Sequence, residues 1–442
     1  MLKNNNNLDF LYIIKWIAKR FGFVKSILFQ MLDSLIYQKE SQFLLHPWSG
    51  HRTPFQMILF YSRFGRILFA TKEFIALLSR GKLLKKSICL EGYEVVESSS
   101  SVGDYSYLWP TSPLLDNETR SCPVEYIEKM QGSLALAYRM ENNSFDKTKE
   151  WDRTSTLFKS LFFNENGDIN QDKLSQFRAT SQRCEEVFGD HFYYVDPEAG
   201  YTKAYLKAID LVLDYHRYSK VINKELLASV SESSVGGSAS VCYRGQYLSE
   251  KLLFHTLMVN DIINHIDFVE TKRNVVVDIG SGYGGLDRLL SYYVPNACFI
   301  LVDLPETLLL TSYFIEHNFP NKKIALLSDI KDRLDTFDCL VQEYDFIIVP
   351  PLVVDHIPSS SIDLVMNSAS LGFMEKDYVN YYLEHINRML RPLGYFYSLN
   401  KEYSDHLGMG YYEWDFKGSY LTKLMAYNNR FSYTQWLGQK RI

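Results

Sequence analysis

The stretch that most constrains the fold of this chain is residues 275–285, with the sequence VVVDIGSGYGG. Three β-branched residues lead into an acidic residue and a Gly-rich turn. This order is typical of a buried parallel strand that ends beside a nucleotide-like ligand at the start of the next helix. Such a strand needs neighbours in a sheet and helices on both faces. The stretch therefore predicts an α/β fold for the C-terminal half.

Strand-like and helix-like segments alternate after residue 275. Strands are expected at 275–279, 298–303, 344–350, 362–367 and 394–399, and helices near 285–293, 306–317 and 376–390. This alternation predicts a Rossmann-like, doubly wound and mainly parallel sheet that is covered on both faces. Residues 323–328 compete with residues 344–350 for the place of the third strand. A helix over residues 249–268 leads into the first strand.

The first 90 residues are basic, although the whole chain is acidic. They contain 14 Lys and Arg against 4 Asp and Glu, which gives +10 and leaves −15 for the rest of a chain whose total is −5. Apolar side chains recur at steps of three and four over residues 8–36, which predicts an amphipathic helix, and residues 63–86 repeat this basic and apolar character. Lys15, Lys19 and Lys25 interrupt any run long enough to cross a bilayer.

Two places for this helix remain open: packed on its own domain, or lying at a membrane surface. The basic residues are interleaved with long apolar side chains, which favours an anionic membrane over nucleic acid as a partner. We therefore expect no nucleic-acid partner, and peripheral membrane contact under the second interpretation.

The composition divides the chain into three regions. Residues 1–110 form the basic amphipathic region, and residues 111–240 are expected to be a mainly helical substrate or cap region. This region ends in a Ser- and Gly-rich run at 229–240, which is either a linker or a mobile lid. Residues 241–442 form the ligand-binding α/β domain.

Six cysteines are scattered without a Cys-x-x-Cys pair, and no cleavable signal peptide is evident. They predict reduced, mostly buried thiols in a cytoplasmic protein. Under the membrane-surface interpretation of the N-terminal helix, the protein would lie at the inner membrane.

The glycines of the loop do not identify its ligand by themselves. Gly280, Gly282 and Gly284 allow a tight turn and a close approach of the backbone to a ligand. Together with Gly285 they satisfy both Gly-x-Gly-x-Gly and the dinucleotide pattern Gly-x-Gly-x-x-Gly. The choice between these ligands depends on neighbouring residues.

Two acidic residues favour one ligand over the other. Asp278 precedes the first glycine by two residues, and a carboxylate there suits the cationic sulfonium and amino groups of S-adenosylmethionine better than a pyrophosphate. Asp303 ends the second predicted strand 25 residues later, where a carboxylate can accept both ribose hydroxyls of a nucleoside cofactor. The pair favours a methyl donor over a nicotinamide cofactor.

Four segments resemble the successive motifs of class I S-adenosylmethionine-dependent methyltransferases: VVVDIGSGYGG, FILVDLPE, SIDLVMNSASLGFM and HINRMLRPLGYFYSLN. The resemblance covers roughly residues 250–442. It implies that the first two segments hold the methionine and ribose ends of the cofactor, and that the third ends the fourth strand beside the methyl group. The cofactor-binding residues that it implies are Asp278, Gly280, Ser281, Gly282, Gly284, Asp303, Leu304 and Asn367.

Over about residues 200–442 the chain is also similar to sugar O-methyltransferases of bacterial surface-polysaccharide biosynthesis. The similar features are a helical N-terminal half, Glu-Ser-Ser at 232–234, Asn-x-x-Ser at 367–370 and Phe-Tyr-Ser-Leu-Asn at 396–400. This similarity implies methylation of a sugar or glycan hydroxyl, with an acceptor that can be lipid-linked. The chain departs from that family at residues 372–374, where Gly-Phe-Met replaces an acidic residue. Two alternatives remain open: a methyltransferase of another small molecule, and a polysaccharide assembly factor that keeps the fold without catalysis, which the missing acidic residue favours.

Methyl transfer to a hydroxyl needs a base that takes the proton, and in this topology the site lies beyond the carboxyl ends of the strands. By that rule the candidate bases are His356, which Asp355 could orient, and His406. Ser370, Asn400 and Glu402 are polar residues near strand ends that suit the binding of sugar hydroxyls. The sequence contains no His, Asp and Glu cluster with recognisable ligand spacing, so no metal is predicted.

Overall fold

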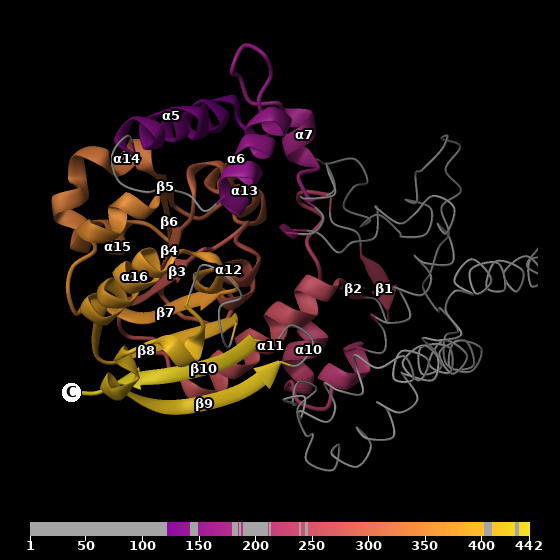
Figure 1. Cartoon of the computed structure of the whole chain (residues 1–442). Coiled ribbons are helices and arrows are strands. Elements are labelled where there is room, and N and C mark those ends of the chain that lie inside the picture. Colours follow the sequence, from indigo (N-terminus) through magenta and orange to yellow (C-terminus); the bar gives the residue numbers. More distant parts are fainter. Residues whose placement is uncertain are drawn as a thin grey trace, which may run out of the picture.

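The strand that carries the Gly-rich stretch, β3 (Asn274–Ile279), lies near the centre of an eight-stranded sheet (Figure 1). The computed structural model describes residues 122–141, 149–178, 184, 187–188, 211, 214–237, 240–243, 246–401, 409–428 and 433–442. The predicted helix at 8–36, the basic stretch at 63–86, Glu402 and His406 lie outside the described residues.

The strand order creates a crevice at the end of β3. From one edge to the other the strands are β5 (Ile324–Leu326), β6 (Phe346–Val349), β4 (Ala297–Val302), β3, β7 (Ile362–Ser368), β8 (Leu390–Lys401), β10 (Tyr433–Lys440) and β9 (Tyr420–Asn428). All pairs from β5 to β8 are parallel, and β10 is antiparallel to both β8 and β9. The chain continues from β3 to β4 on one side and returns to β7 on the other. Such a switch point opens a ligand crevice at the carboxyl ends of the strands.

This architecture is the expected Rossmann-like, mainly parallel α/β sheet, with two differences from the sequence prediction. The competing segments 323–328 and 344–350 both form strands, which pair with each other as β5 and β6. The antiparallel strands β9 and β10 extend the sheet beyond the last strand that was predicted.

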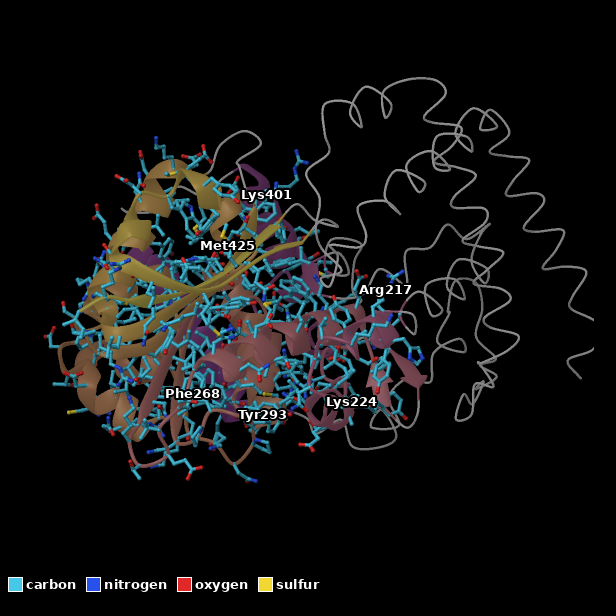
Figure 2. All side chains as sticks on the ribbon, turned by 90° about the horizontal axis from the view of Figure 1, so that it is seen from below. Arg217, Lys224, Phe268, Tyr293, Lys401 and Met425 are labelled. Atoms are coloured by element: carbon cyan, nitrogen blue, oxygen red, sulfur yellow. The ribbon has the colours of Figure 1, made fainter. Side chains whose placement is uncertain are left out.

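Helices cover both faces of the sheet, and side chains fill the space between the layers (Figure 2). One face carries α11 (Glu250–His265), α12 (Gly285–Leu290) and α13 (Pro305–Asn318), which pack with Val276 of β3. The other carries α14 (Leu327–Ile330), α15 (Phe337–Glu343) and α16 (Lys376–Met389), which pack with Val275 and Val277. Because successive strand residues face opposite sides, the Val-Val-Val run serves both cores. Short 3₁₀ turns complete the domain: η5 (Lys331–Thr336), η6 (Pro351–His356), η7 (Leu371–Phe373), η8 (Tyr411–Glu413) and η9 (Phe416–Ser419).

The described part of the preceding region is helical, with α5 (Val124–Glu141), α6 (Lys149–Phe162), α7 (Gln171–Ser175) and α10 (Lys224–Ser229), followed by the hairpin of β1 (Val241–Tyr243) and β2 (Gln246–Leu248). The α5 helix covers the edge strand β5, where Lys129 Nζ donates a 3.1 Å hydrogen bond to the carbonyl of Ile324. Both α5 and α6 are fixed to α13 through the buried Glu306. Its carboxylate accepts from Tyr138 Oη at 2.9 Å and Ser155 Oγ at 3.1 Å.

The Ser- and Gly-rich run is packed rather than free over its described residues 229–237. Glu232 and Ser233 are buried, and the Glu232 amide donates to the carbonyl of Tyr247 in β2. The Glu232 carboxylate pairs with Arg178 at 3.0 Å. These contacts correct the prediction of a linker or mobile lid, because they tie the run to two separate segments.

No described helix combines the length and the apolar run needed to span a bilayer. Cys122, Cys184 and Cys298 are buried, and Cys339 is exposed.

Candidate functional site

The Gly-rich loop turns sharply at the carboxyl end of β3. Gly280, Gly282 and Gly284 have φ values of 78°, 58° and 84°, in the left-handed region that favours glycine. A Cβ on Gly280 would lie 2.1 Å from Ser370 Oγ, so this position has no room for a side chain. The loop thereby brings its backbone against the segment that follows β7.

Asp303 directly follows β4 and holds this loop. Its Oδ2 accepts a 2.7 Å hydrogen bond from the Gly282 amide, and its Oδ1 accepts one of 2.7 Å from the Leu304 amide. Burial raises the pKa of the Asp303 carboxyl to about 7, and the two amides oppose that rise. A carboxylate offers about four acceptor positions, so Asp303 can still accept from a ligand in the pocket.

Asp278 faces the pocket from the other side of the loop, and few polar contacts offset the burial of its carboxyl. It is buried, and its Oδ1 has no hydrogen-bond partner among the described residues. Burial, followed by the nearby Asp287, raises the pKa of Asp278 well above its ordinary value. Burial also raises the pKa of Asp287, on α12, to about 7. A cation that reached Asp278 would therefore supply an interaction that the protein itself lacks.

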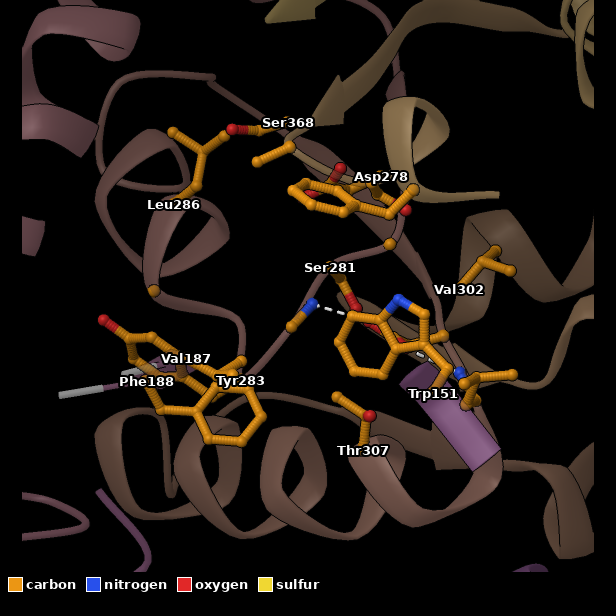
Figure 3. Close-up of a pocket in the computed structure, with 18 of the residues that line it drawn as sticks. Trp151, Val187, Phe188, Asp278, Ser281, Tyr283, Leu286, Val302, Thr307 and Ser368 are labelled. Atoms are coloured by element: carbon orange, nitrogen blue, oxygen red, sulfur yellow. Dashed lines mark hydrogen bonds between the residues drawn. The ribbon is translucent and has the colours of Figure 1, made fainter. Parts of the chain in front are cut away.

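These residues line a pocket of about 250 Å³ at the crevice (Figure 3). The half beside β4 contains Asp303, Leu304 and Thr307, together with Trp151 from α6. The half beside β7 contains Ser370 and Phe373. Aromatic rings from many elements line the pocket: Trp151, Phe188, Phe254, Tyr283, Phe373, Tyr378 and Tyr382. The pocket thus combines the buried carboxyl of Asp278 and the partly buried carboxyl of Asp303 with stacking surfaces for flat or amphipathic ligands.

Asn367 and Asn400 were predicted to bind the cofactor and the acceptor, but the structure places both away from the pocket. Asn367 and Asn400 are fully buried, and neither lines the pocket. Asn367 Nδ2 donates to the Ile279 carbonyl at 2.6 Å, and Asn400 Nδ2 donates to Asn367 Oδ1 at 2.7 Å. Because their polar atoms bond to protein, these two residues hold β3, β7 and β8 together instead of meeting a ligand. Ser370, predicted beside them, does line the pocket.

The predicted catalytic pair, in which Asp355 orients His356 as the base, is not formed in the structure. Asp355 and His356 are exposed at the end of η6, and neither lines the pocket. Asp355 Oδ1 accepts from Tyr381 Oη at 3.0 Å and lies 3.1 Å from His385 Nε2, so it orients His385 and not His356. Pro351, close to the carboxyl end of β6, does line the pocket. The 3₁₀ turn η6, which begins at Pro351, then places Asp355 and His356 away from it.

Sequence reasoning missed the residues that line the pocket from helices before β3, among them Trp151 and His255. Trp151 comes from α6, and His255 comes from the first half of α11, one turn after Lys251. Burial lowers the pKa of His255 to about 3. A basic side chain and an imidazole four residues apart on one helix face are a weak signal, since nothing in the sequence indicates that this face meets the glycine loop. Within the described ranges, no group of three or more His, Cys, Asp or Glu residues is placed to hold a metal ion.

Comparisons with known proteins give structural similarity alone. No protein-family model matches the chain, and no curated protein matches it. A SAM-dependent methyltransferase from Aquifex aeolicus aligns with 11% identity over 41% of this chain and 89% of its own, at a TM-score of 0.26. An O-methyltransferase family protein from Burkholderia thailandensis aligns with 15% identity over 43% of this chain and 59% of its own, at a TM-score of 0.29. A geranyl diphosphate methyltransferase in complex with SAM aligns with 9% identity over 43% of this chain and 88% of its own, at a TM-score of 0.30. Because these scores and identities are low, the case for function rests on the residues of the site.

Proposed function

We propose that the chain is an S-adenosylmethionine-dependent O-methyltransferase that methylates a hydroxyl of a sugar or glycan, in the biosynthesis of cell-surface polysaccharide. The observation that carries the donor half is the pocket at the switch point of the sheet. There a glycine loop in left-handed conformation has a carboxyl on each side, buried Asp278 and partly buried Asp303, and the pKa of each is raised. A dinucleotide would bring pyrophosphate charge to the same loop, where ionised Asp278 would repel it.

The residues present fit this cofactor. The unpartnered Oδ1 of Asp278 suits a cationic group, the remaining acceptor capacity of Asp303 suits ribose hydroxyls, and Gly282, with no atom within 4 Å of its Cβ position, leaves the backbone open to approach. S-adenosylmethionine supplies a methyl group that its positively charged sulfur makes electrophilic. The protein must orient an acceptor oxygen toward that methyl group, exclude water and receive a proton.

The acceptor half is supported by the aromatic lining. Phe254, Phe373 and Tyr378 offer faces on which the apolar side of a sugar ring can stack, and Ser370 Oγ can bond a hydroxyl. The same lining also suits another small amphipathic molecule, which keeps that methyltransferase as a second candidate. The Gly-Phe-Met sequence at 372–374, in place of the family's acidic residue, keeps the non-catalytic assembly factor as a third.

Calorimetry with S-adenosylmethionine and its demethylated product tests the donor half. We expect the wild-type chain to bind both, and Asp303→Ala to lose at least about tenfold in affinity, because it removes a ribose acceptor and releases the Gly282 amide. Binding of NADH in their place would refute the methyltransferase. Detection of a methylated product from a panel of nucleotide-activated sugars would then separate the enzyme from an assembly factor.

We also propose a cytoplasmic location with peripheral contact at the inner membrane through residues 1–110, where a lipid-linked acceptor would be presented. The support is the charge of +10 over residues 1–90 and the amphipathic pattern at 8–36. Co-sedimentation with anionic vesicles tests it: the full chain should bind, and a chain lacking residues 1–40 should bind more weakly. Equal binding of the two chains would refute membrane contact through the first helix.

A further inference from the structure

His255 lies in the half of the pocket where the acceptor is proposed to bind. It is on the N-terminal half of α11, the helix that precedes β3. The first turns of α11 lie at the carboxyl edge of the sheet, where they line the pocket. Farther along α11, Asp261 accepts a hydrogen bond from Gln435 of β10. Since β8 and β10 lie beyond β7, α11 belongs to the β7 side, and Asp303 after β4 belongs to the opposite side.

The surroundings of His255 keep its ring neutral. Burial is the main cause of its lowered pKa of about 3, and the cations Lys251, Arg178 and Arg288 act in the same direction. Glu232 opposes them, but its carboxylate is already paired with Arg178. The Tyr283 ring also lies nearby, with its centroid 6.3 Å from that of the imidazole. A neutral imidazole always keeps one nitrogen with a lone pair that can accept a proton.

We propose that His255 is the base that accepts the proton of the acceptor hydroxyl during methyl transfer, an inference that rests on the proposed function. The hydroxyl oxygen forms a bond to the methyl carbon as the carbon–sulfur bond breaks, and the electron pair of that bond stays on sulfur. The hydroxyl proton passes to the ring nitrogen of His255 and then to water. The alkylated oxygen is a far stronger acid than an imidazolium, so even this weak base takes the proton.

The other described candidates are less suited. His356 is exposed away from the pocket, and Asp303 is engaged with two backbone amides. Asp278 lies beside the cofactor loop, where its charge serves the donor. Among the described residues that line the pocket, His255 is the only imidazole.

Kinetics of the full-length His255→Asn variant test this role, with nucleotide-activated hexoses as acceptors. We expect kcat to fall by about 10²–10⁴-fold while the Kd for S-adenosylmethionine changes by less than about threefold. His356→Asn is the matched control and should keep the wild-type kcat, and thermal melting verifies that both variants are folded. Unchanged kcat in His255→Asn, or a loss confined to cofactor affinity, would overturn the proposal.

Carbethoxylation by diethyl pyrocarbonate decides the question without an acceptor. At about pH 5.5 an ordinary imidazole is mostly protonated and reacts slowly, whereas a neutral ring that opens into the pocket should react. We expect mass spectrometry to find His255 modified both in the free protein and with S-adenosylhomocysteine bound. Protection by S-adenosylhomocysteine would make His255 a cofactor ligand, and absence of reaction in both states would make it a packing residue; either result overturns the proposal.

The two proposals fail in different ways. If the wild-type chain does not bind S-adenosylhomocysteine in calorimetry, the methyltransferase function falls and the role of His255 falls with it. If the wild-type chain binds it and the His255 experiments give the contrary results, only the assignment of the base is lost.

Discussion

Asp278 and Asp303 flank one loop, but their carboxyls have different partners. Both oxygens of Asp303 accept backbone hydrogen bonds, whereas Asp278 Oδ1 has no partner within the described residues and lies near the buried Asp287. Asp303 therefore has a structural role in the free protein, while ionised Asp278 is a cost that only a cationic ligand offsets.

This difference predicts opposite effects of one substitution. Asp278→Asn should raise the melting temperature of the ligand-free protein by a few degrees, because an amide is neutral without the proton that buried Asp278 must hold, and should weaken S-adenosylmethionine binding by about tenfold or more. Asp287→Asn is the matched control, since Asp287 is equally buried but does not line the pocket. It should stabilise the protein without weakening S-adenosylmethionine binding, because it removes a neighbour that raises the pKa of Asp278. Calorimetry and thermal melting measure both, and tight cofactor binding by Asp278→Asn would contradict the assigned role.

At the residue scale, the positions that could be predicted from the sequence are those at the ends of strands. Gly280, Gly282, Asp278, Asp303 and Ser370 line the pocket because each lies at the end of a parallel strand or soon after it, whereas Gly284 packs against α13. His255 and Trp151 could not be found in this way, since they reach the pocket from helices that precede the sheet. Residues at strand ends can also turn away, as the 3₁₀ turn after Pro351 does with Asp355 and His356.

At the element scale, Glu306 joins three helices. It lies in the first turn of α13, is 1% exposed, and accepts from Tyr138 of α5 and Ser155 of α6, with Lys159 Nζ at 3.2 Å. The α6 helix also carries Trp151 to the Asp303 half of the pocket. The attachment of the helical region and the shape of the cofactor half therefore depend on the same carboxylate.

Glu306→Ala should lower the free energy of unfolding by about 1–3 kcal/mol, because buried hydroxyl donors lose their acceptor. It should also weaken S-adenosylhomocysteine binding to the level of Trp151→Ala, since α6 would no longer be held at the pocket. Lys159→Ala is the control: the Lys159 side chain is 50% exposed, so its loss should cost less than about 1 kcal/mol. Denaturant melts and calorimetry test this, and wild-type affinity in Glu306→Ala would show that α6 is held by other contacts.

The order of the central elements was predictable, and the edges of the sheet were not. Buried parallel strands such as β3 and β4 are uniform apolar runs, which the alternation with helices identifies. The strand β5 spans only residues 324–326 before α14 begins, so its pattern gave no reason to accept it beside β6. The strands β9 and β10 are antiparallel and carry polar residues among apolar ones, outside the strand and helix alternation that guided the prediction.

At the scale of the whole molecule, the buried titratable groups should set the pH dependence of stability. Burial raises the pKa of Asp287 and Asp303 to about 7 and that of Asp261 to about 6, and it raises the pKa of Asp278 as well. Each of these groups holds a proton in the folded state that an unfolded Asp, with its pKa near 3.9, has already lost. Their contribution to the free energy of unfolding is fully present below about pH 4 and is lost as the pH rises to about 7.

Two groups act differently. The lowered pKa of His255, about 3, makes the unfolded chain bind an extra proton below about pH 6.5, so this residue opposes the trend with a single proton. The pKa of Glu232 is about 2, since Arg178 outweighs its burial, and its contribution is constant until the pH falls below about 4.5. Between about pH 4 and pH 7 the four aspartates outweigh the one histidine.

The ligand-free protein should therefore melt at a higher temperature at about pH 5.5 than at about pH 8, unlike a protein stabilised mainly by surface ion pairs. A cationic cofactor favours ionised Asp278, so its binding should release protons and should strengthen as the pH rises over the same interval. Melting curves at the two pH values, and calorimetry in buffers of different ionisation enthalpy, measure both effects. The contrary result is a melting temperature that rises with pH in the wild type but not in Asp278→Asn. It would mean that Asp278 is ionised and partnered in the free protein, and that no cationic ligand is needed to offset its charge.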